Sequence, residues 1–153
     1  MIALLAVTVL SAINPVEQFN KARDTGSKQD ASEYLSSLER YYSTFGCYPW
    51  DNAANGGASV PACPAVAVGR TAIAVGGLDA TTNAELSVRN EIKAQFKTRL
   101  AAETVKTNKN VLIVSTDASN LVHVCYLPSS KAFLAQTNGL EDGSAGTTHV
   151  CIP

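Results

Sequence analysis

The feature that most constrains this chain is a strongly apolar start that runs directly into a two-faced helical pattern. Residues 1–13 are apolar except for Thr8 and Ser11. From Val16 to Phe45 the chain is polar overall, yet apolar residues return at helical spacings of three, four and seven. We therefore expect one continuous helix, apolar at its tip and amphipathic below. A subunit of a helical assembly holds its neighbours with a helix of this kind, which favours a building block over an enzyme.

The two halves of the amphipathic stretch differ in character. Apolar side chains are densest in the second half, which we expect to pack on a globular core. We expect the first half to contact water or other subunits. Its polar side chains are Asn20, Lys21, Arg23, Asp24 and Lys28. Gly46 is placed to cap the helix and Pro49 to prevent its resumption, while Pro15 marks either a helix start or a kink.

Composition sets further bounds. The chain has 153 residues, enough for one modest core, with 46% hydrophobic and only 16% charged residues. Its net charge is −1, so no basic excess predicts binding to nucleic acid. The apolar start is too short to span a bilayer as a helix by itself and has no preceding basic residue, as a signal peptide would. We expect it to be the lower part of a longer apolar helix.

Four cysteines indicate disulfides in an oxidising compartment. Cys47, Cys63, Cys125 and Cys151 form no CxxC pair, which disfavours a zinc or redox motif. Three pairings are possible. We favour Cys47–Cys63 with Cys125–Cys151, because each closes a short loop; four buried free thiols are the alternative.

The rest of the chain predicts loops, one helix and strands. We expect a loop over 51–64, and residues 66–81 fit no element clearly. A capping box at Thr82–Glu85 suggests a second helix to about Glu103. Apolar or β-branched runs at 111–115, 121–127 and 131–136 predict an antiparallel meander, with a short return strand at 148–152. The expected fold class is therefore α+β, a long helix packed on a small antiparallel sheet.

No catalytic pattern stands out. His123, in an alternating strand, and His149, in the tail, are expected to be exposed rather than ligands. No nucleophile motif, P-loop or metal-binding helix motif is present, so we expect no enzyme and no cofactor. Glu141 and Asp142 could offer oxygen ligands to calcium, but their spacing is not that of an EF-hand and favours a solvated loop.

The segment from Ala12 to Trp50 resembles a known family. The runs NP-x-EQ-x-x-x-ARD and YY-x-x-x-GCYPW are similar to the N-terminal helix of bacterial type IV pilins and of the related type II secretion pseudopilins. The strand meander and the last two cysteines are similar to the family's head, though less distinctive. The family usually has a glutamate at the fifth position, where this chain has Leu5, and aligning the shared proline suggests that mature residues precede Met1.

The resemblance implies a subunit shaped like a lollipop. Residues 1–30 would be a protruding helix, in the inner membrane before assembly and in the filament core afterwards, and residues 31–153 a disulfide-stapled head. Partners would be identical subunits and the pilus assembly machinery, and the filament would lie outside the cell. The expected core contacts are Leu4, Leu5, Val7, Val9, Leu10, Ile13 and Pro15.

The function implied is a structural filament subunit serving adhesion, twitching motility or DNA uptake. A secretion pseudopilin is the rival within the family. A membrane-anchored surface binding domain is an alternative of another class, and the two classes differ in whether the chain polymerises. A small secreted enzyme is disfavoured by the missing catalytic residues.

Overall fold

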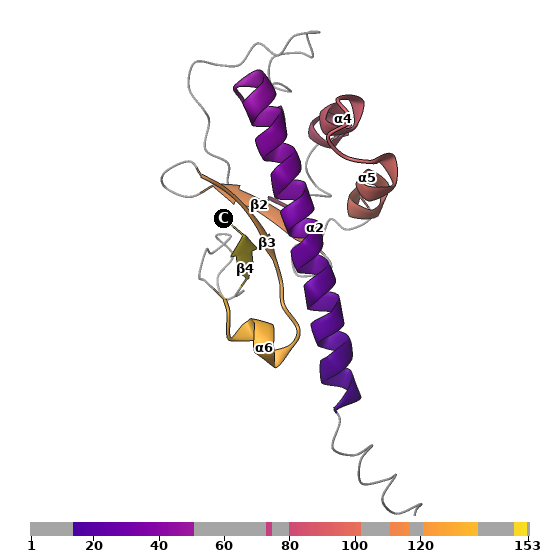
Figure 1. The fold of residues 1–153 in the computed structure, drawn as a ribbon, viewed down its shortest axis with the longest axis vertical. Helices are drawn as coiled ribbons and strands as arrows, with labels where there is room; N and C mark the ends of the chain where they lie inside the picture. Colours follow the sequence, from indigo (N-terminus) through magenta and orange to yellow (C-terminus); the bar gives the residue numbers. More distant parts are fainter. Residues whose placement is uncertain are drawn as a thin grey trace, which may run out of the picture.

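A long helix, α2 (Pro15–Phe45), dominates the structure (Figure 1). The computed structural model describes residues 14–50, 73–74, 80–101, 111–116, 121–137 and 149–152. The Asn14 side chain accepts a hydrogen bond from the Glu17 amide at 3.3 Å, and Pro15 is the first helical residue, where its missing N–H costs nothing. Gly46 ends the helix at φ 75°, and its amide donates to the Tyr42 carbonyl at 2.7 Å. The predicted span and cap of the amphipathic helix are confirmed.

The described strands form an antiparallel sheet in the order β1-β2-β3-β4. They are β1 (Ile73–Ala74), β2 (Leu112–Thr116), β3 (Val122–Tyr126) and β4 (Val150–Ile152). The predicted strands at 111–115, 121–127 and 148–152 are therefore confirmed as β2, β3 and β4, with bounds that differ by a residue or two. Together with α2, this sheet confirms an α+β fold in which a long helix packs on a small antiparallel sheet.

The predicted strand at 131–136 is wrong, because this segment contains a short helix, α6 (Lys131–Leu134). Lysine, alanine and leucine favour helix, and the run has no β-branched residue. The Ser130 hydroxyl oxygen caps it by accepting from the Phe133 amide at 3.4 Å. The place beside β3 is taken instead by β4, paired through Cys125 and Cys151.

The predicted second helix is in fact two helices, α4 (Ala80–Val88) and α5 (Ala94–Ala101). Asn90 separates them with φ 59°, a left-handed conformation that asparagine tolerates better than most residues. The Glu91 amide turns back to the Leu86 carbonyl at 2.8 Å, which closes the end of α4. Because α4 already begins at Ala80, Thr82 lies inside the helix, and the predicted capping box at that residue is wrong.

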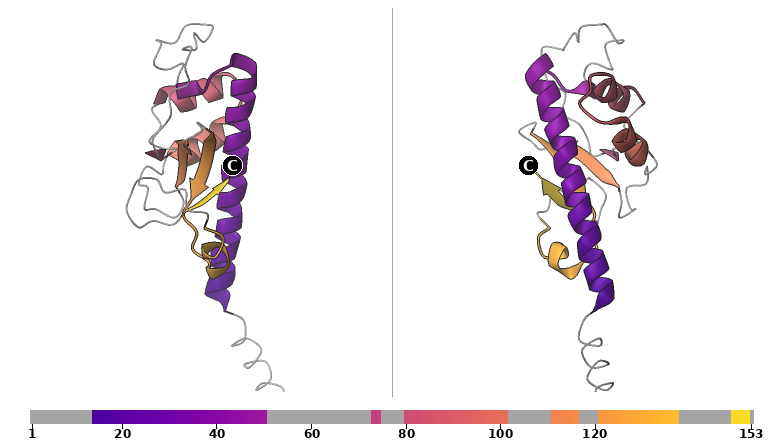
Figure 2. Two further views of the ribbon diagram at one scale, coloured as in Figure 1. Left: turned by 90° about the vertical axis from the view of Figure 1, so that its left-hand side faces the viewer. Right: turned by 45° about the vertical axis from the view of Figure 1, so that its right-hand side comes forward.

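The two faces of the sheet are both apolar, and α2 covers one of them (Figure 2). The main core joins α2 to alternate strand residues, including Leu112, Val114, Val124 and Tyr126. The opposite face carries a smaller cluster of Val111, Ile113, Cys125 and Cys151.

Both histidines are buried, so the expectation of exposure is wrong. His123 lies in β3, where all five residues are buried because both sheet faces are covered. His149 directly precedes the short edge strand β4 and is only 1% exposed.

Candidate assembly surface

The first turns of α2 expose large apolar side chains. Val16 is 65% exposed and Phe19 is 76% exposed. Both lie just beyond the apolar start of the chain. Pro15, a predicted packing residue, lies exposed beside them at the first position of the helix. The other predicted packing residues, Leu4, Leu5, Val7, Val9, Leu10 and Ile13, lie outside the described residues.

The exposed pair is on the same side of α2 as the residues that face the core. Val16 and Tyr34 are 18 positions apart, which is about five full turns of an α-helix. Tyr34 is completely buried in the main core, whereas Val16 is mostly exposed. One face of one helix is therefore covered by the head in its upper half and is open at its base.

A second set of residues fixes the base of α2 to the head through polar contacts. Asp24 is 1% exposed, and its carboxylate accepts the amides of Ser129 at 3.0 Å and Ser130 at 2.7 Å. About two turns lower, the Glu17 carboxylate accepts the Lys131 amide at 2.9 Å. These amides belong to the first turn of α6 and the residues before it, which α2 carboxylates are well suited to satisfy.

Asp24 was expected to face water or other subunits, and this expectation is wrong. The reason is tertiary: helix α6 brings backbone N–H groups that need acceptors to the side of α2 that carries Asp24. The spacing of seven between Glu17 and Asp24, which places both acids on one helix face, was a usable signal. The segment that Asp24 binds carries no matching signal, because the apolar run at 131–136 predicts a strand.

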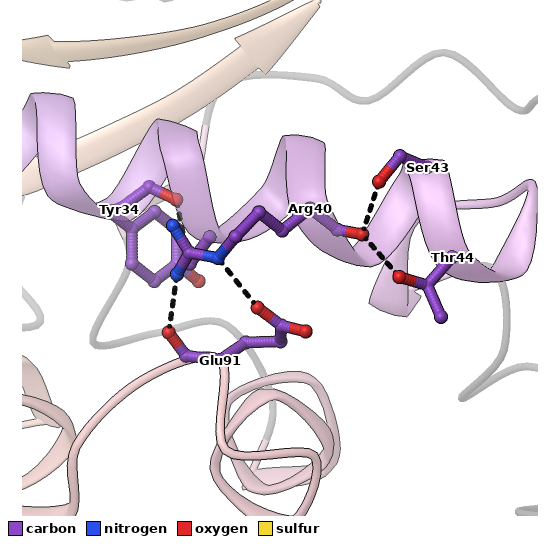
Figure 3. Close-up of polar contacts among 6 residues, drawn as sticks. Tyr34, Arg40, Ser43, Thr44 and Glu91 are labelled. Carbon is purple, nitrogen blue, oxygen red and sulfur yellow. Dashed lines mark hydrogen bonds and ion pairs between the residues drawn. The ribbon is translucent and has the colours of Figure 1, made fainter.

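The upper half of α2 is tied to the α4–α5 pair by a cluster of hydrogen bonds and an ion pair (Figure 3). The Arg40 guanidinium donates to the Glu91 carboxylate and to the Glu91 carbonyl, both at 2.9 Å. The Tyr34 hydroxyl donates to the Asn83 side chain at 2.9 Å inside the core. Arg99 of α5 holds Asp30 with two hydrogen bonds, and that contact is the main cause of the raised pKa of Arg99.

Tyr126 lies between the apolar core and the polar contacts at the base of α2. Its ring is completely buried in the main core and lies edge-on to Phe133 of α6, with ring centroids 6.4 Å apart. Burial, with a smaller contribution from the charge of Asp24, raises the pKa of Tyr126 to about 12. Its hydroxyl oxygen has no hydrogen-bond partner among the described residues.

Disulfides staple the head, as the cysteine count predicted. Cys125 of β3 and Cys151 of β4 are bonded, which confirms that pair. Cys47 is also in a disulfide, whereas its expected partner Cys63 lies outside the described residues. The described cysteines therefore contain no free thiol.

Neither a cluster of metal-ligand side chains nor a membrane-spanning helix occurs in the described part of the chain. Among the described residues, no three histidine, cysteine, aspartate or glutamate side chains come together as a metal site would require. No helix within the same residues combines the length and apolarity needed to cross a membrane. Glu141 and Asp142, the possible calcium ligands, lie outside the described residues, as does the whole loop expected over 51–64.

Comparison with models of protein families, with curated proteins and with solved structures gave no match.

Proposed function

We propose that this protein is a structural subunit of an extracellular filament of the type IV pilus kind, which assembles through its N-terminal helix. One observation carries the proposal: the core-facing side of α2 continues at its lower end as an open apolar surface at Val16 and Phe19. That surface lies next to thirteen residues that are almost wholly apolar. Large apolar side chains gathered at the end of a helix are typical of a surface that another molecule covers.

The remaining features fit a subunit that stacks with copies of itself. Burial of the apolar start against like helices would contribute about 25 cal/mol for each Å² removed from water. A contact between two different surfaces of identical chains, repeated without closing into a ring, produces a helical filament. The head is stapled by disulfides and fixed to α2 at two levels, so it can be carried as a rigid body by the helix.

The proposed partners follow from this assembly. They are identical subunits in the filament, the inner membrane before assembly and the pilus assembly machinery. A secretion pseudopilin is the rival interpretation within the same family. An anchored binding domain would use the apolar start only to hold the head at a surface.

Electron microscopy of material sheared from cells that express the chain tests the proposal. We expect thin helical filaments that contain the chain by mass spectrometry. Leu10→Asp should abolish them while the head stays folded, because a charge in the filament core would be buried without a partner. Val88→Asp, which introduces the same charge at an apolar residue that is 74% exposed at the end of α4, is the control and should leave filaments intact. Normal filaments from Leu10→Asp, or only monomers and membrane-bound chain from the unmodified protein, would contradict the proposal.

A further inference from the structure

Most charged side chains of α2 have partners within the head. Glu17 and Asp24 accept amides at α6, Asp30 pairs with Arg99, and Arg40 pairs with Glu91. Two other groups have a neighbour in the head. Arg23 donates to the Ser129 hydroxyl, and Glu33 is close enough to Arg99 to help raise its pKa.

Three charges on α2 are left over. Lys21, Lys28 and Glu39 take part in no ion pair with another described residue. Lys28 and Glu39 are exposed, and Lys21 is half-buried. We call these three residues the charge strip of α2.

The charge strip follows a line along the helix. Lys21 and Glu39 are 18 positions apart, about five full turns, and Lys28 and Glu39 are 11 apart, about three turns and 20°. All three side chains therefore leave the helix on nearly the same side. The two cations are in the lower half and the anion is in the upper half, with roughly 16 Å of helix between Lys28 and Glu39.

The face of α2 beside Lys28 is hollowed. An open cavity of about 500 Å³ lies along it. The described residues that line this cavity are Thr25, Lys28, Gln29, Ser32, Glu33 and Ser36. They are small or polar, and they leave room for a polar side chain of another molecule beside Lys28. The carboxylate among these described lining residues is that of Glu33, which is close enough to Arg99 to help raise the pKa of Arg99.

We propose that a second copy of this chain docks on the charge strip, parallel to the first and shifted along the helix axis, so that its Glu39 meets Lys28. This inference rests on the proposed filament, and it names which part of the α2 surface its subunits share. Charge complementarity within one strip selects the occupant: the Lys28 cation in the lower half of one copy fits the Glu39 anion in the upper half of another. The helix spacing sets the axial shift between these copies at about 16 Å.

The proposed contact uses one group of the charge strip in each copy. In a parallel pair with an axial shift, Lys28 of one copy meets Glu39 of the other, and the remaining Glu39 and Lys28 of the pair are not used.

Zero-length chemical cross-linking tests the contact in unmodified filaments. A carbodiimide joins an amine to a carboxylate only where the two touch. Within one rigid helix Lys28 and Glu39 are about 16 Å apart, so a link between them must join two copies. Filaments from cells that express a mixture of isotopically light and heavy chains should yield Lys28–Glu39 peptides that combine both labels. Filaments whose Lys28 is linked only to carboxylates outside the charge strip would overturn the inference.

Charge reversal provides the second arm. Lys28→Glu and Glu39→Lys should each lower the filament yield roughly fivefold or more, because an exposed attraction becomes a repulsion at every copy of the contact. The double variant should restore the yield, since the pair is then re-formed with its signs exchanged. Lys93→Glu changes an exposed lysine between α4 and α5 and should have little effect.

The outcomes separate this inference from the proposed function. Filaments that form normally with either single reversal would overturn the docking and leave the filament subunit in place. Absence of filaments from the unmodified chain would overturn both. Because the cross-link uses unmodified protein, a variant that fails to fold cannot hide the answer.

Discussion

The two halves of α2 are held by different physical means. Residues 31–45 pack apolar side chains against the sheet, and Tyr34, Leu38 and Tyr41 are completely buried there. Within residues 15–30 the buried side chain is a charged one. It is Asp24, whose carboxylate accepts backbone amides near α6. Apolar packing thus dominates in the upper half, alongside the hydrogen bonds of Tyr34 and Arg40, whereas the buried contact of the lower half is polar and directional.

This difference indicates how one helix can serve a head and an assembly at once. Apolar burial supplies most of the stability of a fold, so the upper half can hold the head without help from the base. The base needs to be positioned but not covered, because the apolar side chains at Val16 and Phe19 have to stay available. Hydrogen bonds donated by backbone amides to the Asp24 and Glu17 carboxylates fix the position of the base without covering these apolar side chains.

The largest expected effect is the loss of apolar contact in the upper half. Leu38→Ala should reduce the free energy of unfolding by about 2–5 kcal/mol, because it removes a completely buried side chain and leaves a cavity. Urea unfolding of the chain in mild detergent, followed by circular dichroism, measures this change. Phe19→Ala removes a larger but mostly exposed side chain and should shift stability by less than about 0.5 kcal/mol. Equal losses from the two variants would mean that the halves do not differ in this way.

A smaller effect is expected at the polar base. Asp24→Ala should cost about 1–3 kcal/mol, because the amides of Ser129 and Ser130 lose their acceptor in a buried place. Hydrogen exchange should show these amides, and the first turn of α6, exchanging faster while β3 stays protected. Asp24→Asn keeps one acceptor oxygen and should restore part of the protection.

One result of this experiment would contradict the distinction between the two halves of α2. If Asp24→Ala accelerated exchange throughout the sheet, the base would be part of the same cooperative core as Leu38. Glu17→Ala is the milder control, since its carboxylate accepts a single amide at an exposed place.

Much of the fold could be predicted because its signals are local. The helical spacing of apolar residues indicated α2, Gly46 indicated its end, and alternating or β-branched runs indicated β2 and β3. Short loop closure pointed to the Cys125–Cys151 disulfide. Each of these rests on residues that are neighbours in sequence or that carry a strong intrinsic preference.

Most errors occurred where distant residues decide the outcome, whereas the missed break between α4 and α5 is local. Residues 131–136 are apolar enough for a strand, and what makes the first four of them a helix is a cap at Ser130 and acceptors supplied from α2, more than a hundred positions earlier. The break at Asn90 depends on a single residue that accepts a left-handed conformation. The burial of His123 requires that both faces of the sheet be covered, which the alternation within one strand does not show. Of the predicted packing residues, only Pro15 is among the described residues.

The smallest expected effect concerns Tyr126, at the junction of the two halves. At neutral pH, Tyr126→Phe should leave stability unchanged or raise it by up to about 1 kcal/mol, because it removes a buried hydroxyl that has no partner among the described residues.

At high pH the unmodified chain and Tyr126→Phe should diverge in stability. Burial, and secondarily Asp24, raises the pKa of Tyr126 from 10.0 to about 12, so the folded chain holds this proton more tightly than the unfolded chain. Stability from this group is therefore complete below pH 10 and is lost as the pH rises from 10 towards 12. Thermal unfolding across that range, with ultraviolet titration of the five tyrosines, should show a steeper decline for the unmodified chain than for Tyr126→Phe. Identical slopes would mean that Tyr126 ionises as freely in the folded chain as in the unfolded one, and that the polar base does not reach the core at this residue.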